Sequence, residues 1–157
     1  MATTTKTAKA PAKKAAAKAP AKKKSYLSPE EIEAMKATRA ERKRGGANGE
    51  DDLKAAIAKL TGTDKQLAEK LDAIVRANAP SLAGKTWYGL PAWAGADGKT
   101  VIFFTPGAKF KERYASIGFG TSARLDDGNM WQTSFAVLKI GEAEEKKLAA
   151  MLKKAVG

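Results

Sequence analysis

The chain has 157 residues, with 29 Lys and Arg, 17 Asp and Glu, no His and no Cys, and a formal net charge of +12. This length, with 43% hydrophobic residues, predicts one globular domain with an appendage. Without His and Cys, the chain lacks the usual general base near neutral pH and any thiolate, which excludes Ser-His and Cys-His catalysis. No run of the sequence approaches the roughly 20 apolar residues of a membrane span, and the N-terminus has no apolar signal stretch. We expect a cytoplasmic protein with no membrane partner and no cofactor.

The first 25 residues carry two thirds of the net charge, because they hold eight lysines and no acidic residue. Their Lys, Ala and Pro composition provides no aromatic or branched aliphatic side chain to bury, so we expect residues 1–25 to be disordered. The segment resembles the tails of linker histones and of some bacterial nucleoid-associated proteins. The predicted nucleic-acid-binding residues are Lys6, Lys9, Lys13, Lys14, Lys18, Lys22, Lys23 and Lys24.

Each of these lysines can neutralise a phosphate and release a condensed counterion, which gives affinity for nucleic acid without sequence preference. Ala and Pro offer no contacts to base edges, so the segment cannot read a sequence. The predicted partner is nucleic acid, DNA or RNA, or another polyanion, and association with the nucleoid is one expected location. The alternative is a solvated segment that only improves solubility or meets any polyanion, ribosomal RNA included.

Residues 26–49 are predicted to form a charged helix followed by a Gly-rich linker. Ser28 as N-cap, Pro29 at the first helical position and Glu31 three residues after the cap form a capping box. Gly45 and Gly46 follow a basic cluster and mark the end of the helix. Few of its residues are apolar, so we expect this helix to dock weakly.

Residues 50–157 show helical periodicity first, then period-two segments, and then helical periodicity again. Two helices are expected in "GEDDLKAAIAKL" and "TDKQLAEKLDAIVRANAP", with Thr63 and Gln66 as a capping box of the second. About five antiparallel strands are expected in "KTWYG", "LPAWA", "TVIFFT", "ERYASIGF" and "TSFAVLKI", and a last helix from about Glu142. The predicted class is α+β, with the N- and C-terminal helices packed on one face of the antiparallel sheet.

Three strings of this segment, "WYGLPAW", "KFKERYA" and "LDDGNMW", together resemble the YdhG-like family of small domains of unknown function. The resemblance covers about residues 50–157 and implies a frataxin-like α+β sandwich. It also implies an alternative function, intracellular iron chaperone, which some members carry, and it implies no catalytic residues. This chain departs from what iron delivery requires, since Asp64, Glu69 and Asp72 alternate with basic residues and the segment from residue 51 has a net charge of +4.

Aromatic and basic residues of the strand region form a candidate ligand pocket. Because neighbouring residues of a strand point to opposite faces, we expect either Trp87 or Tyr88 to face the helices and the other to be open. An open ring bordered by basic groups would suit a small anionic or nucleotide-like ligand. The favoured interpretation is plainer: the rings pack the second sheet face or a dimer seam, in a monomer or weak homodimer. The candidate residues are Trp87, Tyr88, Trp93, Lys109, Lys111, Arg113, Tyr114 and Trp131.

No metal site is expected, although Asp126 and Asp127, with Asn129, are weak candidates for a hard cation. The favoured interpretation of Asp-Asp-Gly-Asn is ordinary turn chemistry. An enzyme acting on a small anion through Tyr114, Lys109 or Asp127 is the weakest hypothesis, because it requires a strongly shifted pKa. The sequence therefore predicts a non-enzymatic binding module with a nucleic-acid-binding N-terminal segment.

Overall fold

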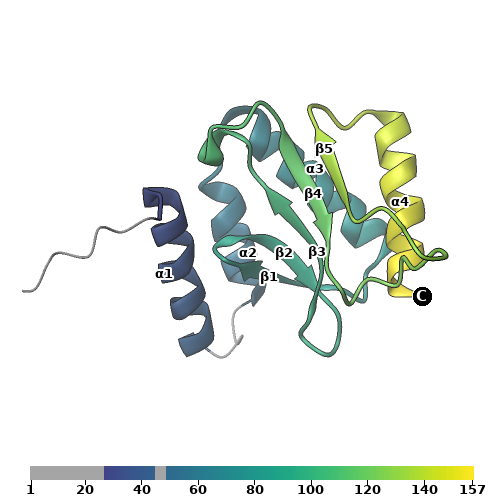
Figure 1. Ribbon diagram of the computed structural model, residues 1–157, viewed down its shortest axis with the longest axis horizontal. Coiled ribbons are helices and arrows are strands. Elements are labelled where there is room, and N and C mark those ends of the chain that lie inside the picture. Colours follow the sequence, from purple (N-terminus) through teal and green to yellow (C-terminus); the bar gives the residue numbers. More distant parts are fainter. Residues whose placement is uncertain (1–26, 45–48) are drawn as a thin grey trace, which may run out of the picture.

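The computed structural model describes residues 27–44 and 49–157, which form an α+β domain with a five-stranded antiparallel sheet and four α-helices (Figure 1). The sheet is a meander in which each strand pairs with the next along the chain, in the order β1-β2-β3-β4-β5. The eight lysines predicted to bind nucleic acid lie outside the described residues, as do Tyr26, Gly45 and Gly46. The elements are α1 (Pro29–Arg44), α2 (Gly49–Ala58), α3 (Gly62–Asn78), β1 (Ala83–Trp87), β2 (Leu90–Ala94), β3 (Thr100–Thr105), the 3-10 turn η1 (Ala108–Phe110), β4 (Ala115–Phe119), β5 (Ser134–Val137) and α4 (Glu142–Val156).

The capping box predicted for α1 is confirmed. The Ser28 N–H donates to Glu31 Oε2 at 2.7 Å, and the Glu31 N–H donates to Ser28 Oγ at 3.2 Å. The helix lies at the β1 side of the sheet, beside α2 (Figure 1), and none of its described side chains belongs to the hydrophobic core. Met35 remains 58% exposed, which agrees with the weak docking that the charged sequence predicts.

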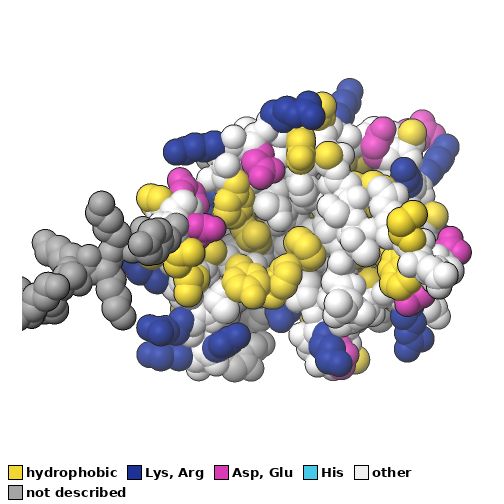
Figure 2. Space-filling model, viewed as in Figure 1, with side chains coloured by type: hydrophobic (Ala, Val, Ile, Leu, Met, Phe, Trp, Pro, Cys, Tyr) yellow, Lys and Arg dark blue, Asp and Glu magenta, His cyan; other side chains and the backbone are white. Residues whose placement is uncertain are grey.

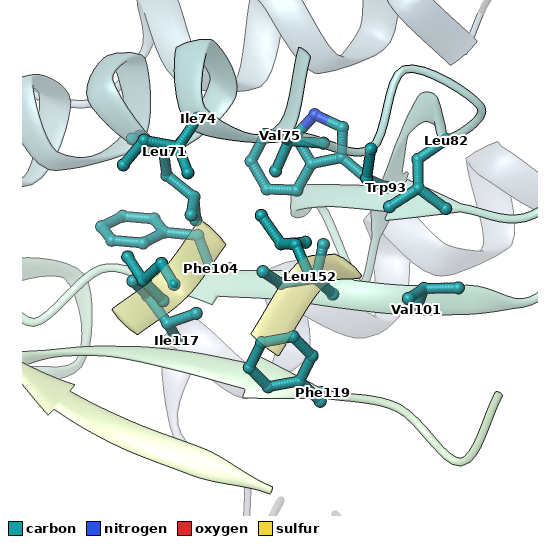
Figure 3. Packing of buried hydrophobic residues seen from close by; sticks show 14 of the residues in the cluster. Leu71, Ile74, Val75, Leu82, Trp93, Val101, Phe104, Ile117, Phe119 and Leu152 are labelled. Atoms are coloured by element: carbon teal, nitrogen blue, oxygen red, sulfur yellow. The ribbon is translucent and has the colours of Figure 1, made fainter. Parts of the chain in front are cut away.

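Helices α2, α3 and α4 cover one face of the sheet, and the core lies between them and the strands (Figure 3). The register places Trp93, Ile102 and Phe119 side by side across three strands on this face. The predicted apolar stripe of α3 packs onto them with its buried residues Leu67, Leu71, Ile74 and Val75. We predicted that helices before and after the sheet in the sequence pack on one of its faces, and this is confirmed for α2, α3 and α4.

The start of α3 differs from the prediction. The capping box of Thr63 and Gln66 was wrong, because the helix begins at Gly62 and both residues lie inside its first turns. The N-cap is Thr61, which makes no capping hydrogen bond with its side chain. The neighbouring Asp64 is buried and accepts hydrogen bonds from the N–H groups of Gly107 at 3.3 Å and Ala108 at 2.9 Å. Asp64 thus ties the first turn of α3 to the connection between β3 and β4.

The predicted hairpin between β2 and β3 is confirmed. Gly98 has a φ of 75°, which favours glycine, and the Lys99 N–H donates to Asp97 Oδ1 at 3.0 Å. The last helix begins at Glu142 as expected, and the Gly141 N–H donates to Glu144 Oε2 at 2.8 Å. Its predicted core residues Leu148 and Leu152 are buried, and Met151 and Val156 pack against the core half-buried.

Candidate functional site

The face of the sheet opposite α2, α3 and α4, called the open face below, is the candidate functional site. Its residues follow from the register, since Lys85 pairs with Ala92, Ala92 with Phe103, and Phe103 with Gly118. Side chains two residues apart along a strand share a face. The open face therefore includes Lys85 and Trp87 of β1, Ala92 of β2, Phe103 and Thr105 of β3, and Ser116 and Gly118 of β4.

Two aromatic rings lie together at the centre of the open face. The ring centroids of Trp87 and Phe103 are 4.7 Å apart with an interplanar angle of 58°, and both side chains are half-buried. Ala92, which lies between their strands, is fully buried. A Cβ atom at Gly118 would overlap the Phe103 ring, so this ring lies directly on the backbone of β4. The small residues at positions 92 and 118 thus let both rings lie low on the sheet with part of their surface exposed.

Tyr88 lies in the turn after β1, and the prediction that Trp87 and Tyr88 face opposite sides of the sheet was wrong. Tyr88 has a φ of 53° and Gly89 a φ of 75°, which are the left-handed conformations of a two-residue hairpin turn. The alternation of the strand therefore ends at Trp87. The Tyr88 side chain is 43% exposed, and its ring meets the Trp87 ring edge-on at a centroid distance of 4.9 Å. Neither ring belongs to the core under α2, α3 and α4, and Tyr88 instead lines a hollow with Met35 and Arg39 of α1.

Trp93 belongs to the core, so its assignment to the ligand pocket was wrong. Its side chain is 0% exposed on the helix-covered face, where Figure 3 shows it among Val75 and Leu82. Its indole Nε1–H donates to Asp72 Oδ1 of α3 at 2.9 Å. The sheet separates Trp93 from Trp87, although the two residues are only six positions apart in the sequence.

The predicted basic residues lie in the connection between β3 and β4, at the end of β3 farthest from the β2–β3 hairpin. Lys109 Nζ is 6.0 Å from the centroid of the Phe110 ring, and the Arg113 guanidinium is 5.3 Å from that of Tyr114. Lys111 Nζ lies 4.0 Å from Glu30 Oε1 of α1. Lys109 and Arg113 therefore contact the rings next to them in sequence, Lys111 lies near α1, and none of the three lines the hollow beside Trp87.

Trp131 is 41% exposed in the loop before β5, at the sheet edge opposite β1. Among the eight candidate pocket residues, the described ring contacts join Trp87 with Tyr88 and Arg113 with Tyr114.

Phe103, Lys85 and Lys99 were missed by the sequence analysis. A hollow of about 550 Å³ beside the rings is lined by these three residues and by Trp87, Thr121 and Ser122. The signal for Phe103 was present in "TVIFFT", because two consecutive phenylalanines of one strand must point to opposite faces. The two lysines carried no comparable signal, since Lys85 meets the β2–β3 hairpin that carries Lys99 only once β1 pairs with β2.

The open face carries positive charge and no acidic side chain from the strands. Lys85 is the only charged residue in the five strands, and its Nζ donates to the Gly98 carbonyl at 3.3 Å. Lys99 is largely exposed, with Nζ 3.9 Å from Asp97 Oδ2. Figure 2 shows hydrophobic side chains gathered over the middle of this view, with Lys and Arg side chains toward its rim and some Asp and Glu side chains among them. Such a surface can stack a planar group and neutralise a phosphate next to it.

The weak metal candidates Asp126 and Asp127 are exposed residues of the loop after β4. Residues 27–44 and 49–157 contain no group of three or more Asp, Glu, His or Cys side chains placed to hold a metal ion. In the same residues, no helix is long and apolar enough to cross a membrane.

Comparisons of the chain with protein families, with curated proteins and with solved structures found no match. The resemblance of residues 50–157 to the YdhG-like family therefore stays a prediction.

Proposed function

We propose that the protein is a non-enzymatic binding module that associates with nucleic acid, DNA foremost, through its N-terminal polycationic segment. The observation that carries the proposal is the distribution of charge. Residues 1–25 hold eight lysines and no acidic residue, whereas the segment from residue 51 has a net charge of only +4. A segment with these charges has a strong electrostatic attraction to phosphate and little to any neutral partner.

The mechanism that we propose is counterion release. Each lysine that approaches a phosphate displaces a condensed cation, and the gain is lost steadily as the salt concentration rises. The Ala and Pro residues between the lysines have no hydrogen-bonding side chains, so base edges are not read. Binding of this kind places the protein along the nucleoid without choosing a sequence.

For residues 50–157 we propose a YdhG-like domain with a frataxin-like sandwich. The coarse arrangement supports this proposal, because three helices lie on one face of a five-stranded antiparallel sheet. No observation on the described residues favours the alternative function of iron chaperone, since their carboxylates form no cluster for a metal ion.

The test is to replace the eight lysines of the segment with glutamine in the full-length protein and to measure binding to a duplex of mixed sequence. At ~150 mM salt the Debye length is about 8 Å, so the small net charge of the rest of the chain is largely screened. We expect the glutamine variant to lose binding in fluorescence anisotropy.

The matched control replaces the same eight lysines with arginine, which keeps the charge, and this variant should bind like the original protein. If the glutamine variant binds as tightly as the original, the segment is not the anchor. The basic residues Lys109, Lys111 and Arg113 would then be the next candidates for the nucleic-acid-binding site.

A further inference from the structure

We propose that the open face binds single-stranded nucleic acid, with bases stacked on Trp87 and Phe103 and phosphates held near Lys85 and Lys99. The proposal builds on the proposed function, since the N-terminal segment would deliver the polyanion to the domain. It goes further in naming a second site, on the folded domain, and the form of nucleic acid that this site takes.

The geometry of the rings is the first support. The ring centroids of Trp87 in β1 and Phe103 in β3 are 4.7 Å apart across β2, and both residues are only half-buried. Gly118 lies under the Phe103 ring, and the absence of a side chain there lets the ring lie low on the sheet. Rings carried by paired strands are fixed more precisely than rings on loops. Every base has a π-face, so rings placed in this way bind bases without strong sequence preference.

The charge around the rings is the second support. The hollow beside Trp87 and Phe103 is lined by Lys85 and Lys99, and no strand contributes a carboxylate. Asp97 of the β2–β3 turn lies 3.9 Å from Lys99 Nζ, and Lys85 has no carboxylate among its described partners. The same charges disfavour a second copy of this chain as the occupant. A two-fold dimer formed through this face would bring two sets of these lysines together.

The shape of the face selects the form of nucleic acid. In a duplex the bases are stacked on one another and cannot reach a sheet surface, whereas a single strand can splay its bases onto aromatic rings. The open face should therefore discriminate single strands from duplexes, which the lysines of the N-terminal segment cannot do.

The experiment compares two single strands of equal length and charge, oligo(dT) and an abasic strand that has no bases. Binding of the full-length protein to each is measured by fluorescence anisotropy. We expect oligo(dT) to bind about tenfold more tightly than the abasic strand, a typical gain for base–aromatic stacking. Equal affinities for the two strands would overturn the proposal.

Two variants assign the effect to the rings. Trp87→Leu with Phe103→Leu keeps an apolar surface but removes both π-faces, and it should reduce the ratio of the two affinities to near one. Trp131→Leu removes an exposed Trp beside the opposite edge of the sheet and should leave the ratio unchanged. Thermal melting of each variant checks that it is folded. If a folded double variant keeps the ratio, the rings are not the site.

The outcome is separable from that of the proposed function. Replacing the eight lysines of residues 1–25 with glutamine should lower both affinities and leave their ratio intact, measured at low salt. If the glutamine variant keeps both the affinities and their ratio, the N-terminal segment is not the anchor, and the proposal for the open face is supported. Sedimentation of the free protein tests whether a second copy of the chain occupies the open face instead. If the protein is a dimer that Trp87→Leu dissociates, and if the two strands bind with equal affinity, the open face is a dimer interface.

Discussion

Trp93 is the largest of the fully buried side chains in the part of the chain that the structure describes. It is fully buried under the helices and donates a hydrogen bond to Asp72 at 2.9 Å. Replacing it with alanine removes a large buried ring and leaves a cavity. We expect Trp93→Ala to lower the free energy of unfolding by about 3–5 kcal/mol, measured by urea denaturation.

Trp87→Ala is the matched comparison, because Trp87 lies half-buried on the open face. Its loss should cost clearly less than the loss of Trp93, since part of the ring is already in water. A Trp93→Ala protein as stable as Trp87→Ala would contradict the assignment of the two faces.

Asp64 is the second residue with a large expected effect. Its buried carboxylate accepts the N–H groups of Gly107 and Ala108, which have no other described acceptor in the connection after β3. We expect Asp64→Ala to cost about 1–3 kcal/mol, because both N–H groups lose their partner. Asp64→Asn keeps one acceptor oxygen and should cost less in the same urea measurement. If alanine and asparagine are equivalent, these hydrogen bonds do not hold the connection.

At the scale of single residues, strand alternation was informative only inside the strands. It correctly separated Ile117 and Phe119 from Ser116 and Gly118. It failed at Tyr88, because a left-handed turn residue does not follow the alternation of the strand before it. Trp93 could not be assigned to a face from its own strand, since every residue of β2 is buried and the segment shows no polar side.

Helices α2 and α3 and strand β1 are joined by the Glu50 carboxylate. Arg76 of α3 donates from Nη1 to Glu50 Oε1 at 3.1 Å, and the Gly84 N–H of β1 donates to the same oxygen. The hydrogen bond from Arg76, helped by that from Gly84, holds the pKa of Glu50 below its ordinary value of 4.5, against the effect of burial. Both side chains are partly exposed, so water screens the pair.

This arrangement predicts how stability depends on pH. A carboxyl with a lowered pKa in the folded state binds protons less readily than in the unfolded state, so it stabilises the fold above about pH 4.5. That stabilisation is lost as the pH falls through the lower folded pKa. We expect Glu50→Gln to have a lower melting temperature at neutral pH and a smaller decrease in melting temperature below pH 4.5 than the original protein.

The control for a simple loss of charge is Glu69→Gln, at an exposed position of α3. It should leave the acid part of the melting curve close to that of the original protein. Identical acid profiles for Glu50→Gln and the original would show that Glu50 does not link the three elements.

At the scale of elements, the presence and type of each α-helix and strand could be predicted from the sequence. The residue at which a helix begins could not always be predicted. The capping box at Ser28 was correct because the Ser-Pro-Glu-Glu order has one consistent local structure. At Thr63 the same kind of pattern was misleading, because α3 begins at Gly62. The start of α3 depends on how the chain leaves α2 and on Asp64. Asp64 accepts hydrogen bonds from residues 43 and 44 positions away, which the local sequence does not show.

The whole molecule has one described core, and all of its residues come from Leu53 onward. Deleting residues 1–24 removes none of them. We expect the melting midpoint to change by no more than about 2 °C, which corresponds to a few tenths of a kcal/mol in a domain of this size. Differential scanning calorimetry of the two chains measures it, and loss of a cooperative transition would contradict the domain boundary.

At this scale the α+β class and the sheet could be predicted, because periodicity and turn residues mark each element. The position of α1 could not, since it has few apolar residues to indicate a face for packing. The open face could not be predicted as a site either. Lys85 and Trp87 come from β1, Phe103 from β3 and Lys99 from the β2–β3 turn, and only the sheet register brings them together.

The central claim, that the lysines of residues 1–25 anchor the protein on nucleic acid, is tested most directly by the salt dependence of duplex binding. Eight lysines that each release a counterion set a slope of log K against log salt of at most about −7. We expect a shallower slope, because 25 residues with the predicted disorder would span ~28 Å and not every lysine would meet a phosphate at once. The glutamine variant should show a slope close to zero. A steep slope that is the same in both proteins would contradict the account.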